Sequence, residues 1–213
     1  MRKYLFIILL NLLFFAAYQY YRLPNVVDRV RSSVVYIQVQ GVDGDRWSGS
    51  GVVVGDGLIL TASHVIDDAN MVTIISDDGG KIKSSEFFMS KDLNNVDLGL
   101  IVVSETNRPA TLSWGDVEIG DTVFAVGSPY GLQNSLTVGV FSAYDRIVQD
   151  ERLYQLDMPG NPGMSGCPVF NRYGSVIGIL VRGAHCGIAL VVPIEMCQVI
   201  VGVYESVQRT TNK

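Results

Sequence analysis

The sequence contains few of the residues that build metal centres or disulfide frameworks. Its 213 residues include two histidines, His64 and His185, and three cysteines, Cys167, Cys186 and Cys197. Neither a C-x-x-C nor an H-x-x-x-H spacing occurs, so we expect no metal site and no cofactor. An odd number of cysteines leaves at least one thiol free or paired between chains, so we do not expect disulfides to hold the fold together.

Charged residues are also sparse. They make up 17% of the chain, against about 25% in typical globular domains, and 16 basic residues face 21 acidic ones. Residues 1–24 contain three basic and no acidic residues, so the remainder is more acidic than the whole. No basic stripe suited to phosphates occurs, and we expect no nucleic-acid partner. With 48% hydrophobic residues, the chain can bury a core as one domain.

Residues 1–24 form a segment of their own. A basic start, MRK, is followed by the uncharged run YLFIILLNLLFFAAY, which is the layout of a secretory signal. As a helix, residues 4–21 would span roughly 27 Å at about 1.5 Å per residue, close to the thickness of a bilayer's hydrocarbon layer. We therefore predict a membrane anchor through residues 4–21, with an aromatic belt at the interface formed by Tyr18, Tyr20 and Tyr21.

Two alternatives to this anchor remain. A cleaved signal peptide needs small residues at the cut, and Ala16 and Ala17 give only a poor site because phenylalanine adjoins them. A buried helix of a soluble protein is the third interpretation. The anchor and the cleaved signal peptide both imply that residues 25–213 are exported to the periplasm or the outside of the cell. The domain would be membrane-anchored in the first case and secreted in the second.

Residues 25–213 show the pattern of an all-β domain. About ten short apolar runs are separated by Gly, Asn, Asp and Pro clusters, with no helical pattern between them. The triplet Gly55-Asp56-Gly57 lies between two of these runs and predicts a hairpin. The only helix expected in the body covers residues 193–208.

Three polar residues interrupt apolar stretches. His64 lies in LILTASHVI, Asp97 in NNVDLGLIVV and Ser165 in GNPGMSGCP. Each has a common structural explanation when taken alone: a core histidine, a turn or cap residue, and a loop serine. Their local sequences, taken together, favour a shared site.

The local sequences resemble those of the trypsin-like serine proteases, and within them the HtrA/Deg-type branch. The histidine motif stands as ILTASHV at residues 59–65, the aspartate motif as DLGLIVV at 97–103, and the serine motif as DMPGNPGMSGCP at 157–168. Two further family segments stand as AVGSPYG at 125–131 and GVFSA at 139–143.

This resemblance covers about residues 25–208 and implies a fold and an activity. The fold would be two six-stranded β-barrels with the site in the cleft between them, followed by the C-terminal helix and preceded by the N-terminal hydrophobic helix. The activity would be that of a serine endopeptidase acting on unfolded or exposed polypeptide. His64 would be the base that activates Ser165, and Asp97 would orient the histidine ring. The backbone N–H groups of Gly163 and Ser165 would form the oxyanion hole.

Two residues near the serine depart from the family pattern. Met164 stands where trypsin-type zymogens carry an aspartate that pairs with a new N-terminus, so we expect no activation by N-terminal cleavage. Cys167 replaces the second glycine of the S-G-G-P run and is expected to be a small buried residue. A disulfide from Cys167 to Cys186 is the alternative, and Cys197 is expected in the core.

The specificity pocket is expected to accept small or medium apolar residues. The family position six residues before the serine is Pro159, followed by Gly160, so no acidic residue is available for a lysine or arginine side chain. The far wall would come from residues 187–190, including Ala189.

The strand at residues 179–183 is expected to pair with the substrate backbone through Val181, Arg182 and Gly183. Arg182 is expected to be a solvated charge at the rim, with a preference for acidic neighbours as the alternative.

The resemblance also bears on assembly and on competing functions. The sequence stops after the expected C-terminal helix, where HtrA-type proteases usually continue into a PDZ domain, so regulation through such a module is not expected. HtrA-type proteases often form trimers through N-terminal aromatic residues, which makes a homotrimer through Tyr18, Tyr20 and Tyr21 an alternative to their membrane role.

The competing functions are a catalytically silent binding or scaffold protein at the membrane and, more remotely, a hydrolase with Cys167 as its nucleophile.

Overall fold

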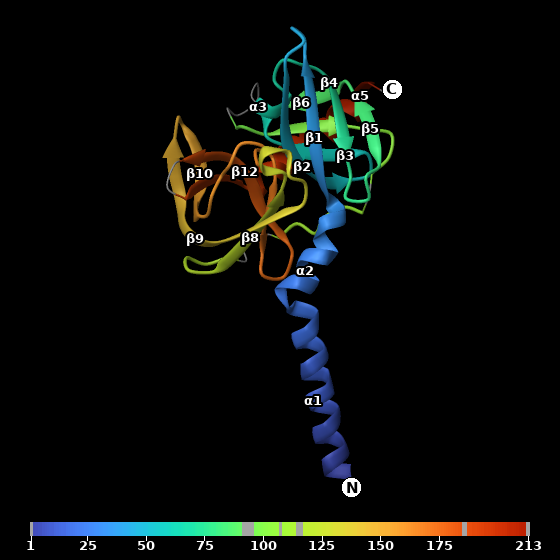
Figure 1. The fold of residues 1–213 in the computed structure, drawn as a ribbon, viewed down its shortest axis with the longest axis vertical. Helices are drawn as coiled ribbons and strands as arrows, with labels where there is room; N and C mark the ends of the chain where they lie inside the picture. Colours follow the sequence, from blue (N-terminus) through green and yellow to red (C-terminus); the bar gives the residue numbers. More distant parts are fainter. Residues whose placement is uncertain (1, 91–95, 107, 114–116, 185–186, 212–213) are drawn as a thin grey trace.

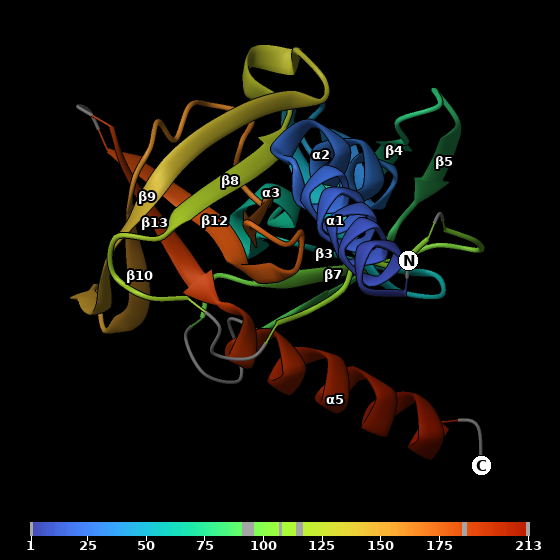
Figure 2. The same cartoon turned by 90° about the horizontal axis from the view of Figure 1, so that it is seen from below.

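The computed structural model describes residues 2–90, 96–106, 108–113, 117–184 and 187–211. Two β units lie side by side, and a long N-terminal helix projects away from them (Figure 1). The C-terminal helix runs along one side of the body, as the view from below shows (Figure 2).

The first β unit is an antiparallel sheet of seven strands in the order β5-β4-β1-β2-β3-β7-β6. The β2–β3 connection is the tight turn predicted at Gly55-Asp56-Gly57, with Gly57 at a φ of +68°. The strands are β1 (Val34–Gly41), β2 (Arg46–Gly55), β3 (Leu58–Thr61), β4 (Ala69–Ile75), β5 (Lys81–Ser84), β6 (Glu86–Met89) and β7 (Gly99–Val102).

The sequence predicts two six-stranded barrels, and the first unit differs from a regular barrel in how it closes. Its end strands β5 and β6 are consecutive in the chain, so the sheet curls until its two ends meet. At that junction the Ser84 hydroxyl donates to the carbonyl of Val102 in β7 at 2.5 Å. A side-chain hydrogen bond therefore bridges the two ends.

The second β unit is the closed six-stranded barrel that the resemblance implies. Its strands follow the order β10-β13-β12-β11-β8-β9. They are β8 (Thr122–Gly127), β9 (Ser135–Val148), β10 (Glu151–Asp157), β11 (Pro168–Asn171), β12 (Val176–Ala184) and β13 (Ile188–Pro193).

The two units share one hydrophobic core. Ile37 and Leu60 of the first sheet are fully buried in the same cluster as Phe124 and Phe170 of the barrel. The rings of Phe124 and Phe170 stack with their centroids 5.1 Å apart. Continuous packing of this kind fixes the relative position of the units, and hence the geometry of the cleft between them.

The C-terminal helix was predicted over residues 193–208 and is observed as α5 (Ile194–Thr211). Its buried side chains Ile194, Cys197 and Ile200 face the core. The other helical elements are α1 (Arg2–Tyr21), α2 (Leu23–Val30), η1 (Arg31–Ser33), α3 (Ser63–Ile66) and η2 (Pro129–Gly131).

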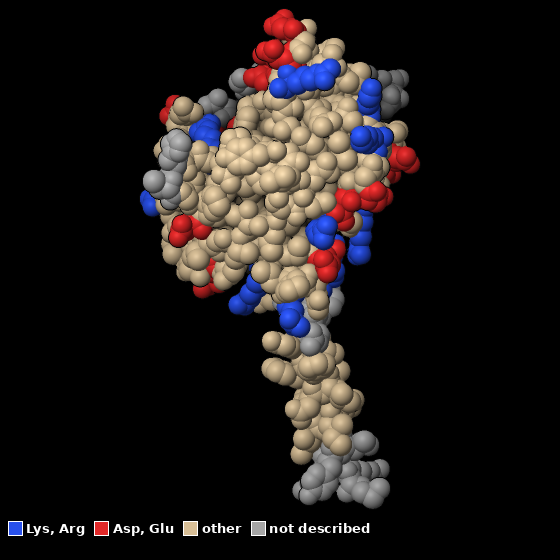
Figure 3. All heavy atoms as spheres, in the orientation of Figure 1, with Lys and Arg blue, Asp and Glu red and all other residues tan. Residues whose placement is uncertain are grey.

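Helix α1 stands clear of the body, and its described side chains are apolar or uncharged (Figure 3). The large apolar side chains from Phe6 to Phe15 are 53–75% exposed. Among the described residues, no single helix has both the length and the hydropathy needed to cross a bilayer. The bent pair Phe6–Tyr18 and Leu23–Ser33, at 55° to each other, meets both requirements jointly.

Candidate active site

His64 lies on the single turn α3, which follows β3 and is held tightly by its neighbours. Val65 and Ile66 are 1% exposed and anchor the turn in the core. The indole N–H of Trp47 donates to the carbonyl of Val65 at 2.7 Å. The side chain of His64 remains 46% exposed and faces the cleft.

Asp97 precedes β7 and orients the His64 ring. Its Oδ2 lies 2.7 Å from His64 Nδ1, while its Oδ1 accepts from the Ser63 hydroxyl at 2.7 Å and from the backbone N–H of His64 at 3.1 Å. Burial alone would raise the pKa of Asp97, but the hydrogen bonds and charge of His64, together with Ser63, hold that pKa below its ordinary value. Asp97 therefore stays ionised and fixes the ring through Nδ1.

Ser165 lies in the loop between β10 and β11, and hydrogen bonds attach this loop to the first sheet. The N–H of Ser50 donates to the carbonyl of Ser165 at 2.8 Å, and its hydroxyl donates to the carbonyl of Gly163 at 2.8 Å. A side chain at Gly49 would meet both Val65 and the Ser165 carbonyl. The serine loop and the histidine turn therefore pack against the same stretch of β2.

Among the described contacts, no hydrogen bond joins His64 to Ser165. His64 and Asp97 line a pocket of about 500 Å³ in the cleft, and Ser165 lines an adjoining pocket of about 640 Å³. In proteins without substrate, hydrogen bonds between a nucleophile and its base are often long. His64 and Asp97 therefore form a fixed pair, and the loop that carries Ser165 is held against the same strand β2 as the histidine turn.

The serine loop also leaves two backbone donors free. Met164 N–H donates to the carbonyl of Asn161 at 3.0 Å, and Gly166 N–H donates to that of Leu180 at 2.7 Å. Within the part of the chain that the structure describes, the N–H groups of Gly163 and Ser165 have no backbone acceptor. Two free donors two positions apart, one of them on the serine itself, are what an oxyanion hole requires.

Gly163 is required by the packing of the loop. Its φ is +92°, and a Cβ at this position would collide with the backbone carbonyl of Ser128 and lie 3.1 Å from Tyr130 N. The observed constraint is the close approach of the loop to residues 128–130.

The pocket beside Ser165 is walled mainly by backbone. Gly160 and Gly183 touch so closely that a Cβ on either would collide with the other. Leu180 and Tyr130 supply apolar surface, and the remaining described lining residues carry no charge. They are Pro159, Gly160, Asn161, Pro162, Gly183, Ala184 and Gly187.

The other predicted pocket residues lie elsewhere. Ala189 is fully buried in the barrel core and does not line the pocket, whereas Gly187 from the same segment does. Val181 is 2% exposed and borders the cleft on the side of His64. Cys186 lies outside the described residues.

Arg182, expected at the rim, is 31% exposed and is paired with a buried carboxylate. Its guanidinium donates to Oε2 of Glu151 at 2.9 Å, and the Glu151 side chain is only 2% exposed. Sequence reasoning missed Glu151 entirely. The alternation in ERLYQLD offers a signal, because Glu151 lies on the same strand face as the buried Leu153.

The described cysteines are free and buried. Burial raises the pKa of Cys167 to about 12 and also raises the pKa of Cys197. A thiol that is difficult to ionise is a poor nucleophile, so Cys167 packs as a small core residue beside Gly127.

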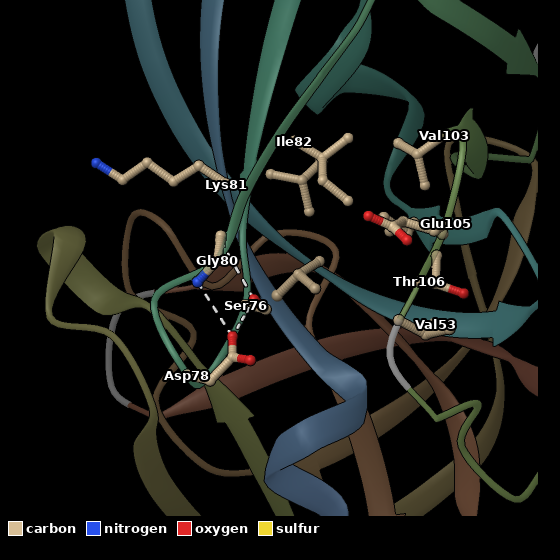
Figure 4. Close-up of a pocket in the computed structure, with 12 residues that line it drawn as sticks. Val53, Ser76, Asp78, Gly80, Lys81, Ile82, Val103, Glu105 and Thr106 are labelled. Atoms are coloured by element: carbon tan, nitrogen blue, oxygen red, sulfur yellow. Dashed lines mark hydrogen bonds between the residues drawn. The ribbon is translucent and has the colours of Figure 1, made fainter.

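A separate pocket of about 350 Å³ opens in the first sheet (Figure 4). Val53, Ile82 and Val103 line its apolar part, and Lys81 and Glu105 lie at its polar edge. None of its described lining residues belongs to the His64, Asp97 and Ser165 constellation.

Comparisons with known proteins agree with this geometry. The model of the trypsin-like peptidase domain family matches residues 49–179. A probable periplasmic serine endoprotease, DegP-like, of Halomonas elongata is 35% identical over 170 residues, which cover 74% of this chain and 35% of that protein. The serine protease HTRA4 of Homo sapiens is 31% identical over 201 residues, covering 86% of this chain and 41% of that protein.

Solved structures give the same result. The serine endoprotease from Yersinia pestis superposes with a TM-score of 0.75 at 28% identity, covering 85% of this chain and 65% of that one. The HtrA-type protease AlgW with tripeptide gives a TM-score of 0.75 at 25% identity, covering 87% and 63%. The chain spans between about a third and two fifths of the length of these two curated relatives. It belongs to the family of trypsin-like peptidase domains.

Proposed function

We propose that the protein is a serine endopeptidase that hydrolyses peptide bonds through His64, Asp97 and Ser165. The observation that carries the proposal is the His64–Asp97 pair, joined at 2.7 Å, with Ser165 in a loop that is held against the same strand as the histidine turn. Its HtrA- and DegP-type relatives are named as serine endoproteases, which supports the same activity.

The chemistry follows from the positions of these groups. The Ser165 hydroxyl attacks the substrate carbonyl while its proton passes to Nε2 of His64, whose Nδ1 is held by Asp97. The developing oxyanion is bound by the N–H groups of Gly163 and Ser165. His64 then gives its proton to the leaving amine, and an acyl-enzyme remains. Water, deprotonated by His64, hydrolyses the acyl-enzyme and frees Ser165.

We propose that cleavage follows small or medium apolar residues. The pocket beside Ser165 is walled by the backbones of Gly160 and Gly183 and by Leu180, and its described lining carries no charge. A lysine or arginine side chain would lose its hydration there without a carboxylate to replace it. Unfolded or exposed polypeptide is the substrate class that an open cleft of this kind admits.

We further propose that residues 4–21 anchor the chain at a membrane, with the domain of residues 25–213 outside the cytoplasm. The exposed apolar side chains of α1 and the joint hydropathy of α1 and α2 support this, as does the periplasmic location named for the DegP-like relatives. Carbonate extraction of membranes should leave the chain in the pellet and release a variant lacking residues 1–24. Tyr18, 59% exposed on α1, would lie at the interface or in a homotrimer contact, and cross-linking distinguishes these roles.

The activity is tested with the full chain in detergent, by fluorophosphonate labelling and by cleavage of unfolded casein. The wild type should label and cut, and Ser165→Ala should do neither. Sequencing of the cut sites tests the apolar pocket, and a preference for arginine before the cut would contradict it. If the wild type neither labels nor cuts, the protein is instead a silent binding or scaffold protein.

A further inference from the structure

A buried carboxylate outside the proposed triad contacts it from across the cleft. Glu151 begins β10 in the barrel, and its side chain is 2% exposed. Its Oε1 accepts a hydrogen bond from the backbone N–H of Asp97 at 2.7 Å, while its Oε2 accepts from Arg182 at 2.9 Å. Asp97 belongs to the first sheet and Arg182 to β12, so Glu151 connects the two β units at the catalytic pair.

The hairpin that presents Glu151 has an unusual turn. Gln149 and Asp150 form a two-residue connection between β9 and β10, with φ values of +54° and +64°. Such a turn favours Asn-Gly or Asp-Gly, and glutamine is strained in it. Strain of this kind persists where the surroundings fix the conformation, often at functional sites. The turn sets Glu151 opposite Val148, at the edge of the cleft.

We propose that Glu151 is a positioning residue for catalysis, which holds the backbone of Asp97 from across the cleft, with Arg182 as the counter-charge that fixes the carboxylate. This inference rests on the proposed function. Glu151 is 50-odd residues away from Asp97 in the chain, and their hydrogen bond ties the orienting carboxylate of the triad to the barrel that carries Ser165. Loss of Glu151 would release the backbone of Asp97 from the barrel at this point.

Arg182 contacts the hairpin at more than one point. Its guanidinium also lies 3.5 Å from the carbonyl of Val148, so it contacts both strands of the β9–β10 hairpin. A buried carboxylate of this kind needs a paired charge to remain ionised. The positive charge of Arg182 is therefore paired with Glu151, which weakens its attraction for acidic residues of a substrate.

The charged groups around Glu151 come from both β units. The charged groups that face Glu151 are Asp97 from the first sheet, His64 from α3 and Arg182 from β12. Burial and the charge of Asp97 raise the pKa of Glu151, while the hydrogen bond from the Asp97 N–H and the charge of Arg182 lower it, and the net effect is a rise above its ordinary value.

The test compares Glu151→Gln and Glu151→Ala with Asp145→Asn, in the full chain. Asp145 is a matched control, since it is an arginine-paired carboxylate on the same hairpin, 56% exposed and remote from Asp97. Glu151→Ala should lower kcat by about 10- to 100-fold, the range expected for a hydrogen bond to a charged acceptor, with KM changed less than about twofold. Glu151→Gln, which can still accept from Asp97 N–H, should recover part of the loss.

A second readout does not depend on turnover. The low-field proton resonance of the Nδ1–H of His64 reports on its hydrogen bond to Asp97, and it should broaden or shift in Glu151→Ala while staying unchanged in Asp145→Asn. If the wild type shows this resonance but neither labels nor cuts, the proposed activity is wrong. The effect of Glu151→Ala on the resonance would then still test whether Glu151 positions Asp97.

Two results would overturn the inference. One is a Glu151→Ala variant with wild-type kcat and a wild-type resonance. The other concerns Arg182→Met: if it raises KM for peptides with acidic residues and leaves kcat unchanged, Arg182 contacts substrate and does not serve Glu151. The expected result for Arg182→Met is a lower kcat with the same KM for acidic and neutral peptides.

Discussion

Gly163→Ala gives the sharpest test of the proposed oxyanion hole. The alanine would have to adopt a φ of +92°, which costs about 1–3 kcal/mol for a residue other than glycine. Its Cβ would also collide with the carbonyl of Ser128, so the loop must move and carry the Gly163 N–H with it. Loss of one oxyanion donor costs about 2.7–4 kcal/mol, and we therefore expect kcat to fall by about 10²- to 10³-fold.

Gly44→Ala separates the cost of the backbone conformation from the loss of an oxyanion donor. Gly44 has a similar φ of +87°, but a Cβ there would meet nothing within 4 Å. It should lose a comparable amount of stability through the backbone alone and keep the wild-type kcat. Urea denaturation measures the stability of both variants, and peptide hydrolysis and fluorophosphonate labelling measure the activity. The reasoning is refuted if Gly163→Ala turns over like the wild type, or if Gly44→Ala loses activity to the same degree.

Three further predictions concern the triad, the pocket and pH. Asp97→Asn should lower kcat by about 10⁴-fold in peptide hydrolysis, because an amide cannot hold the His64 ring in the required tautomer. Gly183→Ala should abolish cleavage after apolar residues, since its Cβ would collide with the Gly160 carbonyl; unchanged kcat/KM would contradict this. Burial raises the pKa of Glu151 above its ordinary 4.5, so its ionisation opposes folding. Stability should therefore fall as pH rises from about 4.5 through the raised pKa, and Glu151→Gln should flatten that part of a thermal-unfolding profile.

Local sequence patterns predict the secondary structure and point to the three residues that we propose as the triad. Alternating and β-branched runs predict the strands, the Gly55-Asp56-Gly57 triplet predicts the β2–β3 turn, and residues 193–208 predict α5. His64, Asp97 and Ser165 stand out because each interrupts an apolar run within a recognisable motif. These signals are local, so neighbouring residues suffice to express them.

Tertiary structure alone decided how distant segments meet. The role of Glu151 depends on Asp97 and Arg182, which lie far from it in the chain, and no local pattern encodes such contacts. Only the packing of the serine loop against Ser128 gives the reason for Gly163. The burial of the Ala189 side chain inside the barrel likewise depends on the closure of the barrel. Hydrogen bonds and close packing between segments arise from the fold as a whole. For this reason the sequence points to the three residues proposed to react but not to the residues that hold them in place.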